Sequence, residues 1–197
     1  MKTIIISGTP GCGKTSVSKK IAKRLNAKVI SLNKLAISKH LSLEYDNYRE
    51  TYIVEIKSLV PILKKQIERI KKEKPDFLII EGHFSDIVPE SYINYVFILR
   101  CDPDELKKRL EKKDYKVKKI RENIQAEILG NCVNYFIQKR IKKPLFEIDT
   151  TNLSIETIAK IIIEILVKNE NADNYKVGNI DWLEKIFQEN RLKEFFD

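Results

Sequence analysis

Glycine is scarce in this chain, with only six in 197 residues, and cysteine is scarcer still, with three. The cysteines Cys12, Cys101 and Cys132 are odd in number and widely spaced, and they follow no metal-ligand pattern. This distribution argues against a disulfide framework and against a zinc site. We therefore expect three reduced thiols.

Long apolar runs are also missing. No stretch approaches the roughly eighteen apolar residues that cross a membrane, and residues 1–6 lead into glycine and proline rather than into a signal-peptide cleavage region. We therefore expect a cytoplasmic protein. The length, together with 43% hydrophobic residues, suits one domain with a real core and a small appendage.

Short apolar runs alternate with amphipathic segments along the chain. The runs predict buried strands at residues 3–7, 28–32, 75–82, 95–99 and 144–148. The amphipathic segments predict helices at residues 14–26, 33–39, 52–72, from 103, from 117 and at 155–165, with a polar loop at 42–51. Asp102 before Pro103 is a strong helix start, and Pro61 is a candidate kink. This alternation predicts a parallel sheet covered on both faces.

After Lys168 the composition becomes polar, and a second amphipathic segment follows. We expect residues 169–197 to form a polar linker and a C-terminal amphipathic helix that follow a domain of residues 1–168. Trp182, Leu183, Ile186 and Phe187 are expected on one side of that helix.

Half of the glycines lie within six positions. The segment Gly8-Thr9-Pro10-Gly11-Cys12-Gly13-Lys14-Thr15 has the full pattern of a phosphate-binding loop, between a predicted strand and a predicted helix. In such a loop the backbone N–H groups surround the phosphates of a nucleotide, the lysine reaches the β- and γ-phosphates, and the threonine hydroxyl can coordinate Mg²⁺. The alternative is a glycine turn that matches the pattern by chance. We expect nucleoside triphosphate binding at this loop.

Glu81 and His83 follow another predicted strand, with Gly82 between them. Open α/β sheets place ligands at this carboxyl edge. Glu81 is therefore a candidate Mg²⁺ ligand, directly or through water, and His83 a candidate to orient an attacking water or acceptor hydroxyl. In the alternative interpretation, Glu81 only ends the strand and His83 is an ordinary loop histidine.

Positive charge is concentrated in residues 104–143, which carry 13 Lys and Arg against six Asp and Glu, a net +7 of the chain's +9. The cations around the predicted join of two helices are Arg109, Lys112, Lys113, Lys116, Lys118, Lys119 and Arg121. A short lid that closes over a γ-phosphate needs such cations. A solvated helix face and a nucleic-acid surface are the alternatives.

Four segments together resemble the atypical adenylate kinases, the family of the eukaryotic nuclear coilin-interacting adenylate kinase and its archaeal counterparts. These segments are the loop at 8–15, Glu81-Gly82-His83, the run from Tyr95 to Asp102, and Arg121-Glu122-Asn123-Ile124-Gln125-Ala126-Glu127-Ile128. The last segment is far more specific than the phosphate-binding loop. The match runs to about residue 168, and the segment from Val177 to Glu184 is similar to an archaeal C-terminal extension.

The resemblance implies a three-layer α/β P-loop nucleoside monophosphate (NMP) kinase fold. It has a five-stranded parallel sheet, an NMP-binding region near residues 31–54, a lid near 112–122 and a C-terminal helical extension. By position, it implies that ATP is held by Gly11, Gly13, Lys14, Thr15 and Ser16, with the lid cation Lys113 where relatives have arginine. Lysine keeps the charge but loses the planar fork.

The same resemblance assigns catalysis to Lys14, Glu81 and His83, and the metal to Thr15 and Glu81. The family pattern has aspartate at the position of Glu81, so the longer side chain favours a water-bridged Mg²⁺. An arginine of the eukaryotic NMP region falls on Ile37, which leaves Lys39 or Arg49 as acceptor contacts.

The implied activity is Mg²⁺-dependent phosphate transfer from ATP to AMP or a related NMP, together with ATP hydrolysis. The resemblance also implies a role in late small ribosomal subunit (30S) maturation and rRNA processing. The partners would be small-subunit ribosomal protein eleven and pre-30S particles, with rRNA contact. Two alternatives stay open: an ATP-hydrolysing ribosome assembly factor with a vestigial NMP site, and a small-metabolite kinase such as a dephospho-coenzyme A kinase.

Overall fold

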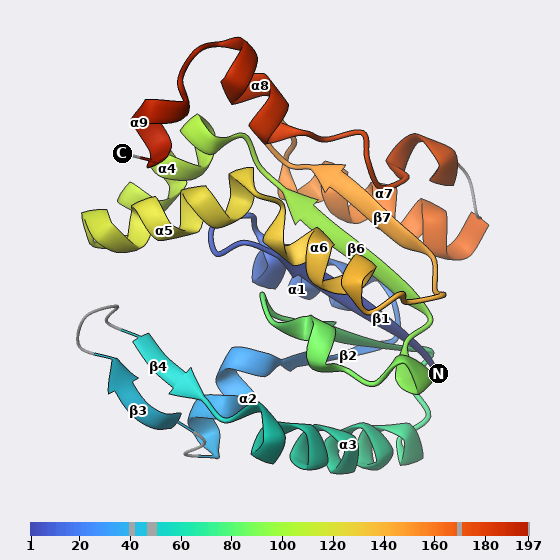
Figure 1. Ribbon diagram of the computed structural model, residues 1–197. Coiled ribbons are helices and arrows are strands. Elements are labelled where there is room, and N and C mark those ends of the chain that lie inside the picture. The colour runs from blue at the N-terminus through green and yellow to red at the C-terminus, as the bar shows by residue number, and fades with distance from the viewer. Residues whose placement is uncertain (40–41, 47–50, 169–170, 197) are drawn as a thin grey trace.

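The computed structural model describes residues 1–39, 42–46, 51–168 and 171–196, with backbone only for 42–46 and 51–54. The strands are β1 (Lys2–Gly8), β2 (Ala27–Ser31), β3 (Ser42–Asp46), β4 (Thr51–Val54), β5 (Phe77–Glu81), β6 (Tyr95–Arg100) and β7 (Leu145–Asp149). The helices are α1 (Lys14–Arg24), α2 (Leu32–Ser38), α3 (Ile56–Lys72), α4 (Pro103–Glu111), α5 (Val117–Ile128), α6 (Asn131–Gln138), α7 (Ile155–Lys168), α8 (Trp182–Gln188) and α9 (Leu192–Phe196). Figure 1 shows their arrangement.

The central sheet has five strands in the order β2-β5-β1-β6-β7, and every neighbouring pair is parallel. This confirms the predicted five-stranded parallel sheet. β1 lies in the middle, so the segment that follows it emerges at the centre of the carboxyl edge. Glu81 pairs in register with Ile6, two residues before β1 ends at Gly8, which places both predicted parts of the site at the same edge.

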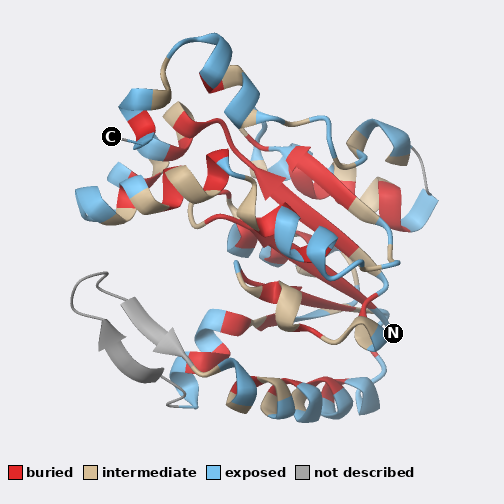
Figure 2. Cartoon of the chain, viewed as in Figure 1, coloured by how far each residue is buried: buried red, intermediate tan, exposed pale blue. Residues whose placement is uncertain are grey.

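Successive residues of the central strand face two separate cores. Ile4 and Ile6 pack into a core with residues of α1, α4, α5 and α7, whereas Ile5 packs into a core with residues of α2, α3 and α6. All three isoleucines are fully buried. The fold is therefore a three-layer sandwich with helices on both faces, and the buried residues follow the strands through its middle (Figure 2).

The predicted loop at residues 42–51 is wrong in part. β3 and β4 form an antiparallel two-stranded sheet, and α3 begins at Ile56 rather than at residue 52. The residues Thr51 to Val54 are β-branched or aromatic, which favours a strand, and this preference outweighs the continuation of the helix pattern. Pro61 lies inside α3, which continues across it without a break.

Two other predicted helices are interrupted. The helix predicted from residue 117 ends at Ile128, and α6 begins after Gly130, whose φ of 63° places it in the left-handed region. The C-terminal helix is divided into α8 and α9 around Asn190, which also has a positive φ. The predicted N-cap of α4 is confirmed, since the Asp102 carboxylate accepts bonds from the N–H groups of Asp104 and Glu105.

The C-terminal segment lies against the core. Lys176 forms an isolated antiparallel bridge to Phe146 of β7, and α8 and α9 lie beside α4 and α5 (Figure 1). Ile186 and Phe195 are buried in the core that α5 shares with α1 and α7. Of the four residues expected on one side of the C-terminal helix, Ile186 is buried, whereas Leu183 and Phe187 are 40% and 61% exposed.

Candidate active site

The phosphate-binding loop joins β1 to α1, as the sequence predicts. Gly8, Gly11 and Gly13 all have φ values between 92° and 136°, which residues with a Cβ rarely adopt. A Cβ on Gly8 would lie 2.3 Å from the carbonyl oxygen of Leu99 on the neighbouring strand β6. The loop therefore depends on glycine both for its backbone conformation and for its close approach to β6.

Lys14 begins α1 and places a cation at the loop. Its side chain is 9% exposed, and Nζ donates hydrogen bonds to the carbonyls of Gly8 at 2.6 Å and Thr9 at 2.9 Å. The first turn of α1 contains no acidic residue, so nothing within the helix offsets the positive end of its dipole. Ammonium group and helix end together favour an anion at this loop.

Glu81 lies at the end of β5, opposite Thr15. It is 4% exposed, and the Thr15 hydroxyl donates to its Oε1 at 3.2 Å. Mg²⁺ prefers oxygen ligands and in phosphate-transfer sites takes only one or two from the protein, because water and phosphate supply the others. The carboxylate and hydroxyl therefore fit such an ion in residue type and in mutual distance.

His83 follows two residues after Glu81. Desolvation by the surrounding protein, followed by the charges of Lys14 and Lys119, lowers the pKa of His83 to about 4. The ring is therefore neutral at physiological pH, with one nitrogen able to donate a hydrogen bond and the other able to accept one. The thiol of Cys132 on α6 donates to the His83 carbonyl at 3.6 Å, which fixes the backbone behind the ring.

A cavity of about 280 Å³ brings the predicted site residues together. Its lining includes all eight of them: Gly11, Gly13, Lys14, Thr15, Ser16, Glu81, His83 and Lys113. Lys113 reaches the cavity from the exposed turn between α4 and α5. The positions of these residues in the sequence do not by themselves predict that they come together, because this depends on the order of the strands in the sheet.

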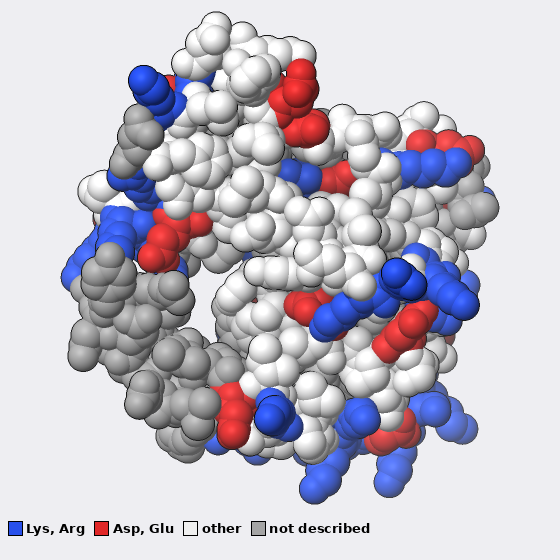
Figure 3. All heavy atoms as spheres, in the orientation of Figure 1, with Lys and Arg blue, Asp and Glu red and all other residues white. Residues whose placement is uncertain are grey.

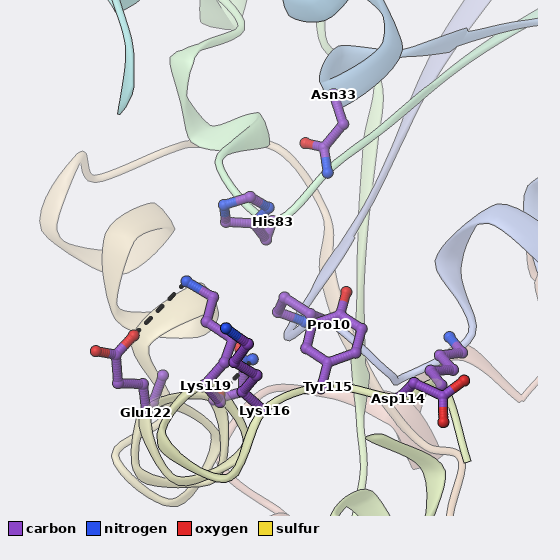
Figure 4. Close-up of a pocket in the computed structure, with 11 residues that line it drawn as sticks. Pro10, Asn33, His83, Asp114, Tyr115, Lys116, Lys119 and Glu122 are labelled. Atoms are coloured by element: carbon purple, nitrogen blue, oxygen red, sulfur yellow. Dashed lines mark hydrogen bonds and ion pairs between the residues drawn. The ribbon is translucent and has the colours of Figure 1, made fainter. Parts of the chain in front are cut away.

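A larger cavity of about 630 Å³ adjoins the first, and the two share Pro10, Asn33, His83, Lys113 and Tyr115. In Figure 4, Asn33 and His83 face Lys116 and Lys119 of the α5 side across the space. Lys119 forms an ion pair with Glu122 at 3.6 Å. The sequence did not lead us to predict Asn33, Tyr115 or Asn123 as site residues. For Asn123, the only available signal was its place in the segment that carries the family resemblance.

The family resemblance suggested Lys39 and Arg49 as contacts for the acceptor, and the structure describes only the first of them. Lys39 is exposed at the end of α2 and is not among the residues that line either cavity. Lys34, five residues earlier in α2, lines the smaller cavity instead. Arg49 lies outside the residues that the structure describes, and Ile37 is 63% exposed.

Comparison with known proteins decides the family. A family sequence model described as an AAA domain matches residues 4–130. A protein of Methanocaldococcus jannaschii named "Putative adenylate kinase" is 39% identical over 184 residues, which cover 93% of this chain and 94% of that protein. The chain belongs to this adenylate kinase-like family. A relative of the same name in Methanosarcina barkeri is 38% identical and covers 92% of the chain and 97% of its own length.

The fold comparison agrees with this family. A deoxyadenosine kinase structure from M. mycoides superposes with a TM-score of 0.55 at 15% identity, covering 84% of this chain and 99% of the other. The likeness shows an α/β P-loop kinase fold for this family member. Among the described residues, no helix is long and apolar enough to cross a membrane.

Proposed function

We propose that this protein is a Mg²⁺-dependent nucleoside monophosphate kinase that transfers the γ-phosphate of ATP to AMP or a related NMP. The observation that carries the proposal is the pair of adjoining cavities that meet at His83. One contains the phosphate-binding loop, and the other offers polar and cationic side chains to a second ligand. A kinase needs two such spaces with a common boundary, because donor and acceptor must meet in line.

In the proposed reaction, an oxygen of the acceptor phosphate attacks the γ-phosphorus of ATP. The bond from γ-phosphorus to the β–γ bridging oxygen breaks, and ADP leaves with the electron pair. Lys14 and the loop N–H groups hold the β- and γ-phosphates, and Lys113 adds a cation from the turn between α4 and α5. Mg²⁺, held through Thr15 and Glu81, would neutralise developing charge on the phosphates.

His83 acts in this scheme as a neutral hydrogen-bonding group. An acceptor phosphate monoester already carries charged oxygens near neutral pH, so the attack needs no strong base. The imidazole, with its lowered pKa, is suited to orienting the attacking oxygen at the boundary of the two cavities.

The segments at 31–54 and 112–122 would be the NMP-binding region and the lid.

The test is ADP formation from ATP and Mg²⁺, with and without AMP or another NMP. The proposal expects strong acceleration by at least one NMP and loss of activity in Lys14→Ala. Equal ADP formation with and without every NMP would instead favour ATP hydrolysis as the main activity. Metal dependence is checked by titrating Mg²⁺ into protein treated with a chelator, with nucleotide affinity as the direct measurement.

The second candidate is ATP hydrolysis linked to small ribosomal subunit maturation, which the family resemblance implies. The exposed segment 112–118 includes four lysines and lies beside the cavities. Figure 3 shows Lys and Arg gathered at this end of α4 and α5, with acidic side chains between them and the hollow in the surface. Such a surface suits a phosphate-rich partner as well as a nucleotide.

Co-sedimentation with small-subunit precursors tests this candidate. It expects nucleotide-dependent association in the wild type and altered release in Lys14→Ala, because that variant lacks the cation at the phosphates. No association in any nucleotide state would exclude the ribosomal role. Direct binding to small-subunit ribosomal protein eleven, and to rRNA alone, identifies the component that is contacted.

A further inference from the structure

Glu127 on α5 has a fully enclosed carboxylate that contacts three separate parts of the chain. The residue is 1% exposed. Its Oε1 accepts hydrogen bonds from Arg100 Nε at 2.7 Å, from the Cys101 N–H at 3.1 Å and from Trp182 Nε1 at 3.3 Å. Its Oε2 accepts bonds from the Thr9 hydroxyl and, at 3.9 Å, from the Cys12 thiol. Oε1 therefore faces the end of β6 and the C-terminal segment, and Oε2 faces the phosphate-binding loop.

The position of the Glu127 carboxylate relative to β6 is fixed by ion pairs. Arg100 is 3% exposed and forms ion pairs with Glu127 and with Glu147 of β7. Burial alone would lower the pKa of Arg100, but the charges and hydrogen bonds of the two carboxylates outweigh burial and raise it. A buried pair of this kind holds its partners in one geometry, because separation would leave a charge unpaired. Oε2 consequently has a defined position relative to the loop.

The loop side leads directly to the phosphate-binding cation. The Thr9 hydroxyl binds Glu127, and the Thr9 carbonyl accepts bonds from Lys14 Nζ at 2.9 Å and from the Cys12 N–H at 3.2 Å. A displacement of Thr9 would therefore move the groups that position Lys14. The charge of Glu127 also contributes, after burial, to raising the pKa of the Cys12 thiol well above its ordinary value, so Cys12 remains a neutral donor.

Trp182 is held in place by the docking of the whole C-terminal segment. Lys185 pairs with Asp102 at 2.6 Å, and Arg191 binds both oxygens of Asp104 at 2.8 and 2.9 Å. On α5, the Gln125 side chain donates to the Phe195 carbonyl at 2.7 Å. The indole N–H therefore reaches Glu127 as part of an ordered surface between α8, α9 and the core.

We propose that Glu127 is a positioning residue for the phosphate-binding loop, and that Trp182 connects the C-terminal segment to it and so sets the affinity for nucleotide. The inference rests on the proposed function, because it concerns ATP binding at this loop. The path runs from the indole N–H through the two oxygens of one carboxylate to the Thr9 hydroxyl. The C-terminal segment thereby becomes part of the nucleotide site without touching the nucleotide.

A double-mutant cycle between the two ends of this path is the test. Trp182→Phe removes the indole donor but keeps an aromatic ring, and Thr9→Val removes the hydroxyl donor at nearly constant volume. Calorimetry gives the Kd for MgATP of each single variant, the double variant and the full-length wild type. Phe187→Leu, an exposed aromatic change on the same helix, is the matched control, and Thr9→Ser should restore wild-type affinity.

We expect Trp182→Phe to weaken MgATP binding about threefold to tenfold in the wild-type background and less than about twofold in the Thr9→Val background. Equal effects in both backgrounds would show that Trp182 has only a general structural role and would overturn the inference. So would wild-type affinity in Trp182→Phe. If the wild type itself fails to bind MgATP, the proposed function fails and this inference fails with it.

Trp182 is the only tryptophan, so its fluorescence gives a readout that needs no change at that residue. Saturating MgATP is expected to shift the emission of the wild type and to leave that of Thr9→Val unchanged at saturation. This measurement decides the matter if Trp182→Phe does not fold. An unchanged wild-type emission despite calorimetric binding, or an equal shift in Thr9→Val, contradicts the inference.

Discussion

Lys14 is positioned for phosphate contact by the backbone of the phosphate-binding loop and of the start of α1. Its ammonium group lies between two loop carbonyls, at the start of a helix with no acidic residue in its first turn. We expect Lys14→Ala to lower phosphate transfer by about 100-fold or more, because the charge that develops on the phosphates loses its nearest cation. Steady-state ADP formation measures the loss.

Lys23→Ala is the matched control for that variant. Lys23 is an exposed lysine near the end of the same helix. Thermal unfolding is expected to show both variants folded, and only Lys14→Ala is expected to lose activity. Comparable loss of activity in both would contradict a specific role for Lys14.

His83 gives a prediction on pH. Its pKa is about 4 in the folded protein against an ordinary 6.5, so between these values the unfolded chain binds more protons. Stability therefore rises with pH through this window, and His83 destabilises the fold as the pH falls below 6.5. We expect wild type to lose more stability than His83→Gln on acidification from pH 7 to pH 4.5, as measured by urea unfolding.

The same pKa constrains catalysis. His83→Gln should lower the rate by a factor that is constant between pH 5 and pH 8, since the imidazole stays neutral throughout. An inflection near pH 6.5 in the wild-type rate that disappears in His83→Gln would contradict this prediction. It would show that His83 titrates during turnover.

At the scale of single elements, α4 depends on its cap. Asp102 Oδ1 accepts bonds from two N–H groups of the first turn, at 2.9 and 3.3 Å. Asp102→Ala is expected to lower the free energy of unfolding by about 1 kcal/mol. Asp102→Asn keeps the cap acceptor and loses only the ion pair with partly exposed Lys185, which costs less than about 0.5 kcal/mol. Equal losses in the two variants, measured by urea unfolding, would contradict the capping role.

The central elements were predictable from sequence because their pattern and their structure have the same physical cause. Buried parallel strands are continuous apolar runs, and the strand-loop-helix order of the phosphate-binding loop is visible in residues 3–15. The β3 and β4 strands were not predictable in the same way, since a strand at Thr51–Val54 and the start of a helix share the same short apolar pattern. The break after Ile128 depends on the left-handed conformation of Gly130, which composition alone does not reveal.

The candidate site also contains residues that were recognisable from sequence and residues that were not. Residues within one motif, such as Lys14 and Thr15, are recognisable from spacing. Glu127 is not, because its partners Thr9 and Trp182 lie 118 and 55 positions away, and only the packing of α5 and α8 brings them together. The segment from Arg121 to Ile128, which carries the family resemblance, includes Glu127 and was the available signal, but it does not identify these partners.

At the scale of the whole molecule, the C-terminal segment is part of the core. Ile186 and Phe195 are 1% and 5% exposed, and the Gly178 N–H satisfies Glu147 Oε2 at 2.8 Å. Deletion of residues 169–197 removes both apolar side chains, each of which contributes roughly 1.5–3 kcal/mol of burial. We expect the shortened chain to lose several kcal/mol of stability and to aggregate.

Thermal unfolding and light scattering of the shortened chain check this prediction. Phe187→Ala is the control, because that side chain is 61% exposed and its loss should have little effect on unfolding. Unfolding of the shortened chain at the wild-type temperature would contradict the assignment of α8 and α9 to the core.

The path from Thr9 through Glu127 to Trp182 also has a consequence for synthesis on the ribosome. The phosphate-binding loop is among the first segments to emerge, but its link to Trp182 can close only when the last helices have been made. Domains generally fold as units during synthesis. The loop of a nascent chain therefore lacks this link until Trp182 has left the ribosome, so the contacts that fix the phosphate-binding loop are completed late in folding.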